Sequence, residues 1–251
     1  MKIRIKFRKY GTMKFIGHLD VMRYFQKAIR RADVDVCYSG GFSPHQIMSF
    51  AAPLGVGNTS NGEYVDIEVP STKDSETMKK CLNGVMSEGF EVVSYRGLPD
   101  DAANAMSIVG AGDYTLAFRP GYEPEDMDKE TWFQGLIAFF ERPSVMVTKK
   151  TKRGEKEMDL KPLVYELRIC PEGDGEMEGP RLFMKISAGS AANVKPEQVL
   201  DAYYGFLGKE RPPFAFMVQR EEVYADRASD AEKEAGIHSF ISLEQLGEEI
   251  R

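Results

Sequence analysis

Alternating apolar and polar positions at the start of the chain predict a half-buried strand. In "KIRIKFRK" (2–9), Ile3, Ile5 and Phe7 share one face, and the lysines and arginines between them share the other. Because side chains alternate across a strand, this pattern gives one buried face and one basic face. From 18 to 32 the apolar residues are spaced three or four positions apart, which predicts an amphipathic helix with a basic outer side.

The same patterns, followed along the chain, predict one order of elements twice. In the first half we expect strands at 34–39, 45–53, 62–69 and 90–98, and a helix at 75–89. In the second half we expect strands at 113–119, 144–150, 163–169, 181–189 and 214–224, and helices at 125–142 and 196–208. Allowing one extra strand in each half, the order β-α-β-β-α-β occurs twice, as in split βαβ units. The predicted fold class is α+β, with tandem ferredoxin-like units and antiparallel sheets.

Composition divides this predicted chain into four parts. Residues 1–98 form an N-terminal ferredoxin-like domain, and 113–225 form a second one that carries a basic hairpin loop. Between them, the Pro-, Asp- and Ala-rich stretch 99–112 predicts a linker. Residues 226–251 are acidic, and we expect them to form a loosely attached tail.

Length and composition restrict the class of protein. A chain of 251 residues with 42% hydrophobic and 29% charged residues is typical of globular proteins that bury a substantial core. No apolar run reaches the roughly 18 residues that a membrane helix needs. Cys37, Cys81 and Cys170 are far apart and odd in number, which favours the reducing cytoplasm over a disulfide framework. Without a C-x-x-C motif, we expect no Cys-ligated zinc or iron–sulfur centre. We also expect no other metal and no cofactor in this chain.

The net charge of −6 conceals a segregation of charge along the chain. Residues 1–31 carry ten Lys or Arg and one acid, and "KKTKRGEK" (149–156) carries five bases and one acid. Conversely, 99–130 has eight acids against two bases, and 221–251 has nine acids against three bases. A local basic patch attracts polyanions whatever the overall charge, so the pattern indicates nucleic-acid binding. Solvated strand and helix faces are an alternative explanation of the same runs.

The most distinctive motif is "YSGGFSPHQIMSF" (38–50). Its two glycines permit backbone conformations that other residues resist, and Ser43-Pro44 initiates a turn. Its hydroxyl, amide and imidazole groups suit phosphates or base edges. Phe42 could stack on a base, whereas Phe50 lies in an apolar run and is expected in the core. A tight β-hairpin turn would require the same residues.

Two histidines lie near these elements. A histidine titrates near neutral pH, so His18 or His45 could act as a general acid or base, or contact a phosphate. Asp20, close to the start of the helix, could instead simply cap it or interact with its dipole. A metal site built from both histidines with Asp20, Glu63 or Asp66 is a further alternative, which nothing in the spacing requires.

These observations together give a predicted nucleic-acid interface. It combines the basic strand, the basic helix, the 38–50 motif and the basic loop. The residues expected to contact phosphates or bases are Arg4, Arg8, Lys14, Arg23, Arg30, Ser39, Phe42, Ser43, His45, Ser49, Lys149, Lys150, Lys152, Arg153 and Lys156.

The sequence resembles a family of bacterial proteins described only as radical-SAM-linked. The resemblance is carried by "RIKFRKYGTMKFIGHLDVMRYFQKAIRRA", by "YSGGFSPHQIMSFAAPLGVGNTSNGEYVDIEV" and by "KKTKRGEKEMDLKPLV". The N-terminal part of this resemblance covers residues 3–69. The family usually has Ser before His-Leu-Asp, where this chain has Gly17, so one potential helix cap is lost. The activity of the family is unassigned, and the matching positions therefore come without roles.

The resemblance implies a partner for this chain. Members of the family are often joined to, or encoded beside, radical-SAM proteins that also carry a cobalamin-binding domain. S-adenosylmethionine and an iron–sulfur cluster are therefore expected only in that partner. A looser, fold-level likeness to RAMP-type RNA-binding proteins and repeat-processing endonucleases agrees with the basic strand and helix.

The resulting hypothesis is a non-catalytic accessory module that binds RNA, with tRNA as one candidate, and acts with a radical-SAM enzyme. One alternative is a metal-independent RNA endonuclease that uses His18 or His45. Another is a protein-interaction subunit that touches no nucleic acid.

Overall fold

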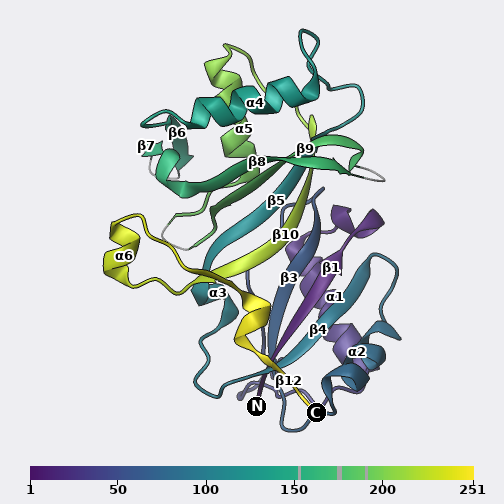
Figure 1. Cartoon of the computed structure of the whole chain (residues 1–251). Helices are drawn as coiled ribbons and strands as arrows, with labels where there is room; N and C mark the ends of the chain where they lie inside the picture. Colours follow the sequence, from purple (N-terminus) through teal and green to yellow (C-terminus); the bar gives the residue numbers. More distant parts are fainter. Residues whose placement is uncertain (152–153, 174–176, 190–191) are drawn as a thin grey trace. The chain divides into compact units, whose positions relative to one another are not determined.

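The structure is a computed structural model that describes residues 1–151, 154–173, 177–189 and 192–251 (Figure 1). It confirms the predicted class, because the described chain is a mixed α+β fold whose strands pair mainly antiparallel. The chain forms two compact units. Unit 1 comprises 1–110 and 220–251, and unit 2 comprises 111–219. No helix in the described ranges has the length and apolar character needed to cross a membrane.

Unit 1 contains the N-terminal elements together with the end of the chain. Its elements are β1 (Lys2–Lys9), η1 (Gly11–Phe15), α1 (His18–Arg31), β2 (Met48–Phe50), β3 (Thr59–Glu68), α2 (Ser75–Asn83), β4 (Phe90–Leu98), α3 (Ala105–Ile108), most of β10 (Phe216–Asp226), α6 (Asp230–Glu234), β11 (Phe240–Ser242), η4 (Leu243–Leu246) and β12 (Glu248–Glu249). The sheet order is β12-β4-β1-β3-β10, and β2 also pairs with β3.

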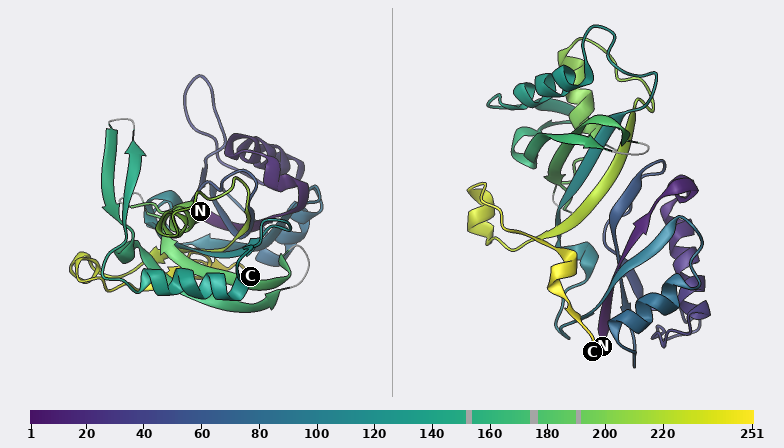
Figure 2. Two further views of the ribbon diagram at one scale, coloured as in Figure 1. Left: turned by 90° about the horizontal axis from the view of Figure 1, so that it is seen from above. Right: turned by 45° about the vertical axis from the view of Figure 1, so that its right-hand side comes forward.

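The two faces of the unit 1 sheet are covered by different elements. The predicted apolar face of β1 is confirmed, because Ile3, Ile5 and Phe7 are fully buried in a core with Phe25 of α1 and Leu82 of α2. Burying such side chains contributes about 1.5–3 kcal/mol each, which fixes both helices to this face. The C-terminal segment crosses the other face (Figure 2).

Unit 2 has its own aromatic core. Its elements are β5 (Val109–Phe118), α4 (Lys129–Phe140), β6 (Met146–Thr151), β7 (Gly154–Asp159), η2 (Lys161–Leu163), β8 (Val164–Gly173), β9 (Gly179–Ser187), α5 (Pro196–Phe206) and the first residues of β10. Strands β5, β9 and β8 pair in that order, and Trp132 of α4 packs among Phe118, Phe133 and Tyr203. Hairpin β6–β7 forms a separate two-stranded sheet and projects from the helices of this unit (Figure 2).

The strand order in unit 1 follows the predicted topology. Strand β2, which comes after α1, is separated from β1 by β3, and β4 lies on the other side of β1. This is the arrangement of a split βαβ unit. The tandem ferredoxin-like arrangement remains our interpretation of these orders.

Two predicted strands differ in the structure. The segment 34–39 is not a strand, since it makes only an isolated bridge between Tyr38 and Gln46. Val34 and Val36 are nevertheless buried, so the apolar alternation reflects packing into the core rather than a ladder. Within 45–53, only Met48–Phe50 forms a strand.

Three further segments are more ordered than the sequence pattern indicates. The expected linker contains α3 and the start of β5, and Asp66 anchors it by accepting a hydrogen bond from the Ala105 N–H (2.9 Å). The strand that begins within the basic run, β7, was not predicted because it lacks an apolar face. The final residues belong to unit 1 rather than to a separate tail, since Leu243 is fully buried there.

Candidate nucleic-acid interface

Helix α1 presents a row of cations to solvent. Its inner side buries Val21, Phe25, Ala28 and Ile29, and the high amphipathicity of the sequence orients it in this way. The outer cations follow at i, i+4, i+7 and i+8, and so lie along one side of the helix: Arg23, Lys27, Arg30 and Arg31. We call these four residues the α1 cation row.

The charges of the α1 cation row are largely uncompensated. Arg23 pairs with Asp20 at 3.3 Å, but both side chains are more than half exposed, so the pair contributes little. Lys27 makes no hydrogen bond or ion pair with any residue in the described ranges. Arg30 and Arg31 donate to the neutral main-chain carbonyls of Gln26 and Val85. The row can therefore attract an anion.

Lys27 was not among the predicted contacts, although its position four residues after Arg23 places it on the same side of the helix and would have identified it.

The loop 38–46 is closed by Ser39 and His45. The Ser39 N–H donates to the His45 carbonyl (2.8 Å), and the His45 N–H donates to Ser39 Oγ (3.1 Å). The same hydroxyl lies 2.8 Å from His45 Nδ1. Gly41, at a φ of 100°, supplies a backbone conformation that L side chains rarely adopt. This closure projects Phe42 into solvent with a relative exposure of 110%.

A buried glutamine attaches this loop to α1. Gln46 is 4% exposed, and its Nε2 donates to the main-chain carbonyl of Gln26 at 3.3 Å. Gln26 lies between Arg23 and Lys27 in the sequence. The predicted helix and the predicted motif are thus brought together, because the loop that carries the exposed ring of Phe42 contacts the main chain in the middle of α1.

The two histidines lie on different elements. His18 begins α1, is half-buried, and packs edge-on against the ring of Phe50 at 5.4 Å. His45 is exposed and committed to Ser39. No contact between described residues joins the two imidazoles, and Asp20 pairs with Arg23 rather than with either. In the described ranges no three His, Cys, Asp or Glu side chains form a group that could hold a metal.

The basic face of β1 is paired with acids of the same unit. Arg4 is 2% exposed; its Nε and Nη2 contact the Asp66 carboxylate at 2.8 and 2.9 Å, and its Nη1 donates to the Leu243 carbonyl. The structure therefore argues against the predicted phosphate contact by Arg4, whose guanidinium is buried and already paired. Arg8 is about half exposed but pairs with Glu91 at 3.1 Å.

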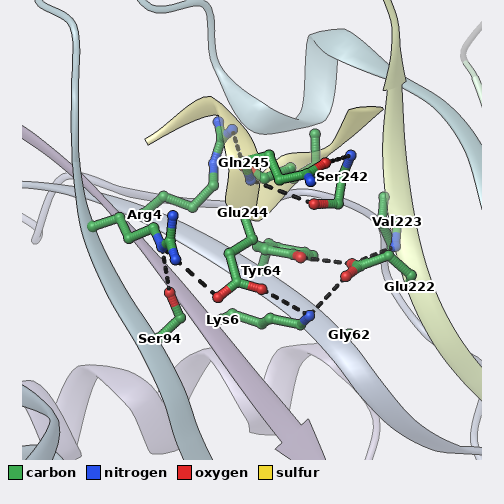
Figure 3. Close-up of polar contacts among 12 residues, drawn as sticks. Arg4, Lys6, Gly62, Tyr64, Ser94, Glu222, Val223, Ser242, Glu244 and Gln245 are labelled. Carbon is green, nitrogen blue, oxygen red and sulfur yellow. Dashed lines mark hydrogen bonds and ion pairs between the residues drawn. The ribbon is translucent and has the colours of Figure 1, made fainter. Parts of the chain in front are cut away.

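Lys6 occupies the centre of a charged network on the same sheet face (Figure 3). Its Nζ contacts Glu222 at 2.7 Å and Glu244 at 3.0 Å, and the Tyr64 hydroxyl donates to Glu222 at 2.6 Å. Burial alone would lower the pKa of Lys6, but the two carboxylates outweigh it and the pKa is raised. Burial and the neighbouring Glu222 charge raise the pKa of Tyr64 well above its usual range, so the phenol stays a neutral donor. The network attaches η4 to the sheet.

A second buried charge cluster lies on the helix-covered face. Arg220 forms an ion pair with Glu63 and donates to the Ala52 carbonyl (2.8 Å). Lys9 is 2% exposed, and burial lowers its pKa although the Glu63 charge opposes the shift. Sequence analysis did not identify Arg220 or Glu222, because their partners are more than 150 positions away and no local pattern reports such pairs.

The remaining predicted contacts are dispersed. Ser49 donates to Asn104 (2.7 Å), so it tethers the α3 segment instead of lying on the loop, whereas Ser43 is exposed on it. Lys14 lies over the ring of Phe15 beside α1. Lys152 and Arg153 lie outside the described residues, as do the side chains of Lys149, Lys150 and Lys156.

The sequence comparisons place the chain in a family without assigning an activity. No curated protein matches the sequence. Residues 2–196, which are most of the chain, match the family described as "Uncharacterized protein conserved in bacteria" (DUF2344), and the protein therefore belongs to that family.

Proposed function

We propose that the protein is an accessory module that binds single-stranded RNA through the α1 cation row and the 38–46 loop, for a radical-SAM enzyme. The observation that carries this proposal is the hydrogen bond from Gln46 to Gln26, which attaches the loop with the fully exposed Phe42 ring to the helix that bears the α1 cation row. Proteins that bind single strands combine these two features: cations follow the phosphates and aromatic rings stack on bases.

The four cations supply affinity without sequence preference. Each phosphate contact to a single strand contributes about 0.7 to the slope of log K against log salt concentration, so four contacts predict a slope of about −3. Attraction of this kind is strongest at low salt and acts on any RNA.

Phe42 supplies a preference for unpaired bases. A stacked base contributes about 1–3 kcal/mol, and only a base that is free of its own stack can use the ring. Duplex RNA keeps its bases paired, and its deep, narrow groove excludes side chains. The geometry therefore favours single strands, loops or unpaired ends of folded RNA.

The radical-SAM partnership rests on the resemblance of the sequence. Co-purification with the radical-SAM protein that is joined to or encoded beside the family member tests it directly. A nuclease has less support, because His18 packs against Phe50 and no described contact links it to His45 or to a free carboxylate.

Fluorescence anisotropy with a labelled oligouridylate of about 12 nucleotides, at about 50 and 200 mM salt, tests RNA binding. We expect salt-sensitive binding that falls at least about tenfold in Arg23→Glu/Arg30→Glu. The matched control is Lys73→Glu/Lys80→Glu, which makes the same charge change at exposed positions outside α1.

A second arm tests the aromatic contribution. Phe42→Ala should weaken oligouridylate binding about tenfold and leave the binding of a duplex of equal length unchanged. Phe214→Ala, which removes a ring that is 78% exposed in unit 2, is the control. Failure to bind at low salt, or equal loss in both charge variants, contradicts the proposal. Cleavage of the RNA that is lost in His45→Ala identifies a nuclease instead.

A further inference from the structure

Unit 2 carries a groove of about 560 Å³ at the base of hairpin β6–β7, beside helices α4 and α5. Its apolar lining includes Phe139, Val145, Val147 and Phe206. Met146 and Phe206 are 57% and 49% exposed. Large apolar side chains that remain exposed around a concave surface are typical of an interaction site.

One wall of the groove is a strand edge. Strand β6 pairs with β7 along residues 146–151 and 154–159, and its other edge has no strand partner in the described part of the chain. Met146, Val147 and Thr148 of β6 line the groove. In an antiparallel pair, alternate residues direct their N–H and C=O groups away from the partner strand. Such an edge is a template for an added extended peptide.

The charge of the groove is positive. The Arg142 guanidinium lies over the ring of Phe206 at 4.1 Å and over Phe139 at 5.2 Å, and it has no ion pair within the described ranges. The acid in the lining, Asp201, is already paired with Arg211 at 2.6 Å. An acidic occupant therefore gains an ion pair here without displacing one.

Charge also argues against a second copy of this chain as the occupant. Two copies that paired through β6 would place Lys149 and Lys150 of both strands, which open the basic run 149–156, within one ladder. Like charges in close contact oppose association. A peptide that carries carboxylates is attracted by the same run.

We propose that this groove docks an extended, acidic segment of a partner protein. The segment adds a strand to the free edge of β6, places apolar side chains against Val147 and Phe206, and sets a carboxylate on Arg142. This inference is independent of the RNA interface, because all of its residues belong to unit 2.

The test uses the full chain and a labelled peptide of about ten residues with alternating valine and glutamate, followed by fluorescence polarisation. We expect saturable binding, at least about tenfold weaker for the valine–lysine peptide. A valine–glutamate peptide that is N-methylated at alternate residues cannot donate to the strand edge, and should also bind at least about tenfold more weakly.

Variants then locate the binding site. Arg142→Glu should reverse the preference between the acidic and basic peptides, whereas Arg168→Glu, at an exposed arginine of β8, should retain it. Absence of binding at about 1 mM peptide, equal affinity for the N-methylated peptide, or an unchanged preference in Arg142→Glu would overturn the proposal. If Arg142→Glu instead abolishes oligouridylate binding and leaves the peptide affinity unchanged, the groove is a nucleic-acid site and the proposal fails.

Discussion

The Gln46 side chain donates a hydrogen bond to the Gln26 carbonyl in the middle of α1, at 3.3 Å and shielded from water. This contact joins two segments that are 20 positions apart in sequence. It positions the loop that carries Phe42 without adding charge. A mutation of Gln46 can therefore change the position of the loop without changing the charge of the α1 cation row.

We predict that Gln46→Leu weakens RNA binding while its salt dependence stays unchanged. The substitution removes a hydrogen bond with a net value of about 1 kcal/mol, which corresponds to about a fivefold loss of affinity if the loop loses its position. Because the cations remain, the slope of log K against log salt should not change. Anisotropy titrations at several salt concentrations measure both quantities. A change in slope would show that the loop positions phosphate contacts rather than the ring.

The ion pair between Lys6 and Glu244 predicts that the stability of the fold decreases at acidic pH. Burial alone would raise the pKa of Glu244, but Lys6, with Ser94 and Arg96, outweighs it and holds the pKa below its usual 4.5. A carboxylate with a lowered pKa stabilises the fold above its unfolded pKa, and this contribution disappears as the pH falls through the folded pKa.

We therefore expect Glu244→Gln to reduce stability by about 1 kcal/mol at pH 7, or about 2–4 °C in Tm. The difference from the native chain should shrink as the pH falls below 4.5 and vanish below the lowered pKa of the folded state, where Glu244 is protonated both folded and unfolded. Thermal unfolding followed by circular dichroism across this pH range measures it. Glu248→Gln, at an exposed position of the same segment, should have little effect at any pH. A deficit that persists undiminished in acid would mean that the contact acts through packing rather than charge.

The buried charge cluster of Lys9, Glu63 and Arg220 should respond differently to the loss of its anion and to the loss of a cation. It contains two cations and one anion, all less than 10% exposed. Removing Glu63 leaves two like charges buried near each other without the carboxylate that pairs with Arg220, whereas removing Arg220 leaves the charges of Lys9 and Glu63 balanced. Breaking a buried pair costs about 3–5 kcal/mol when a charge is left uncompensated. We expect Glu63→Gln to lower the free energy of unfolding by that amount, and Arg220→Met to lower it clearly less. Urea unfolding of both variants measures the two losses, and equal losses would contradict the predicted asymmetry.

The local elements were predictable where one short-range pattern determines them. The alternation at Ile3, Ile5 and Phe7 identifies β1, and the helical spacing identifies α1 with its basic outer side. Phe42, in a Gly-Gly-Phe-Ser-Pro turn, is exposed rather than part of the core, and its stacking on a base stays a prediction.

Pairings across the chain were not predictable. The sequence of β1 indicates a basic solvent face, but the acids that neutralise Arg4 and Lys6 come from β3, β10 and η4. A count of charges in residues 1–31 therefore overestimates the uncompensated positive charge, since a local window does not contain the acids that pair with Arg4 and Lys6. The cations of α1 remain exposed, and unit 1 supplies few acids to pair with them.

The close approach of β10 to β3 gives a last prediction, at Gly62. A Cβ added there would lie 2.7 Å from the Glu221 carbonyl oxygen and 2.8 Å from the Glu222 Cα, both main-chain atoms that cannot rotate away. Gly62→Ala must therefore displace β10, and with it Arg220 and Glu222 from their partners Glu63, Tyr64 and Lys6.

Overpacking by the added methyl group costs about 1–3 kcal/mol of stability by itself, and the lost ion pairs should place the effect of Gly62→Ala at the upper end of that range. Gly40→Ala, where a Cβ meets nothing within 4 Å, is the matched control and should be neutral or slightly stabilising. Thermal unfolding compares the two variants, and a Gly62→Ala protein as stable as the control would show that β10 can shift without loss of these contacts.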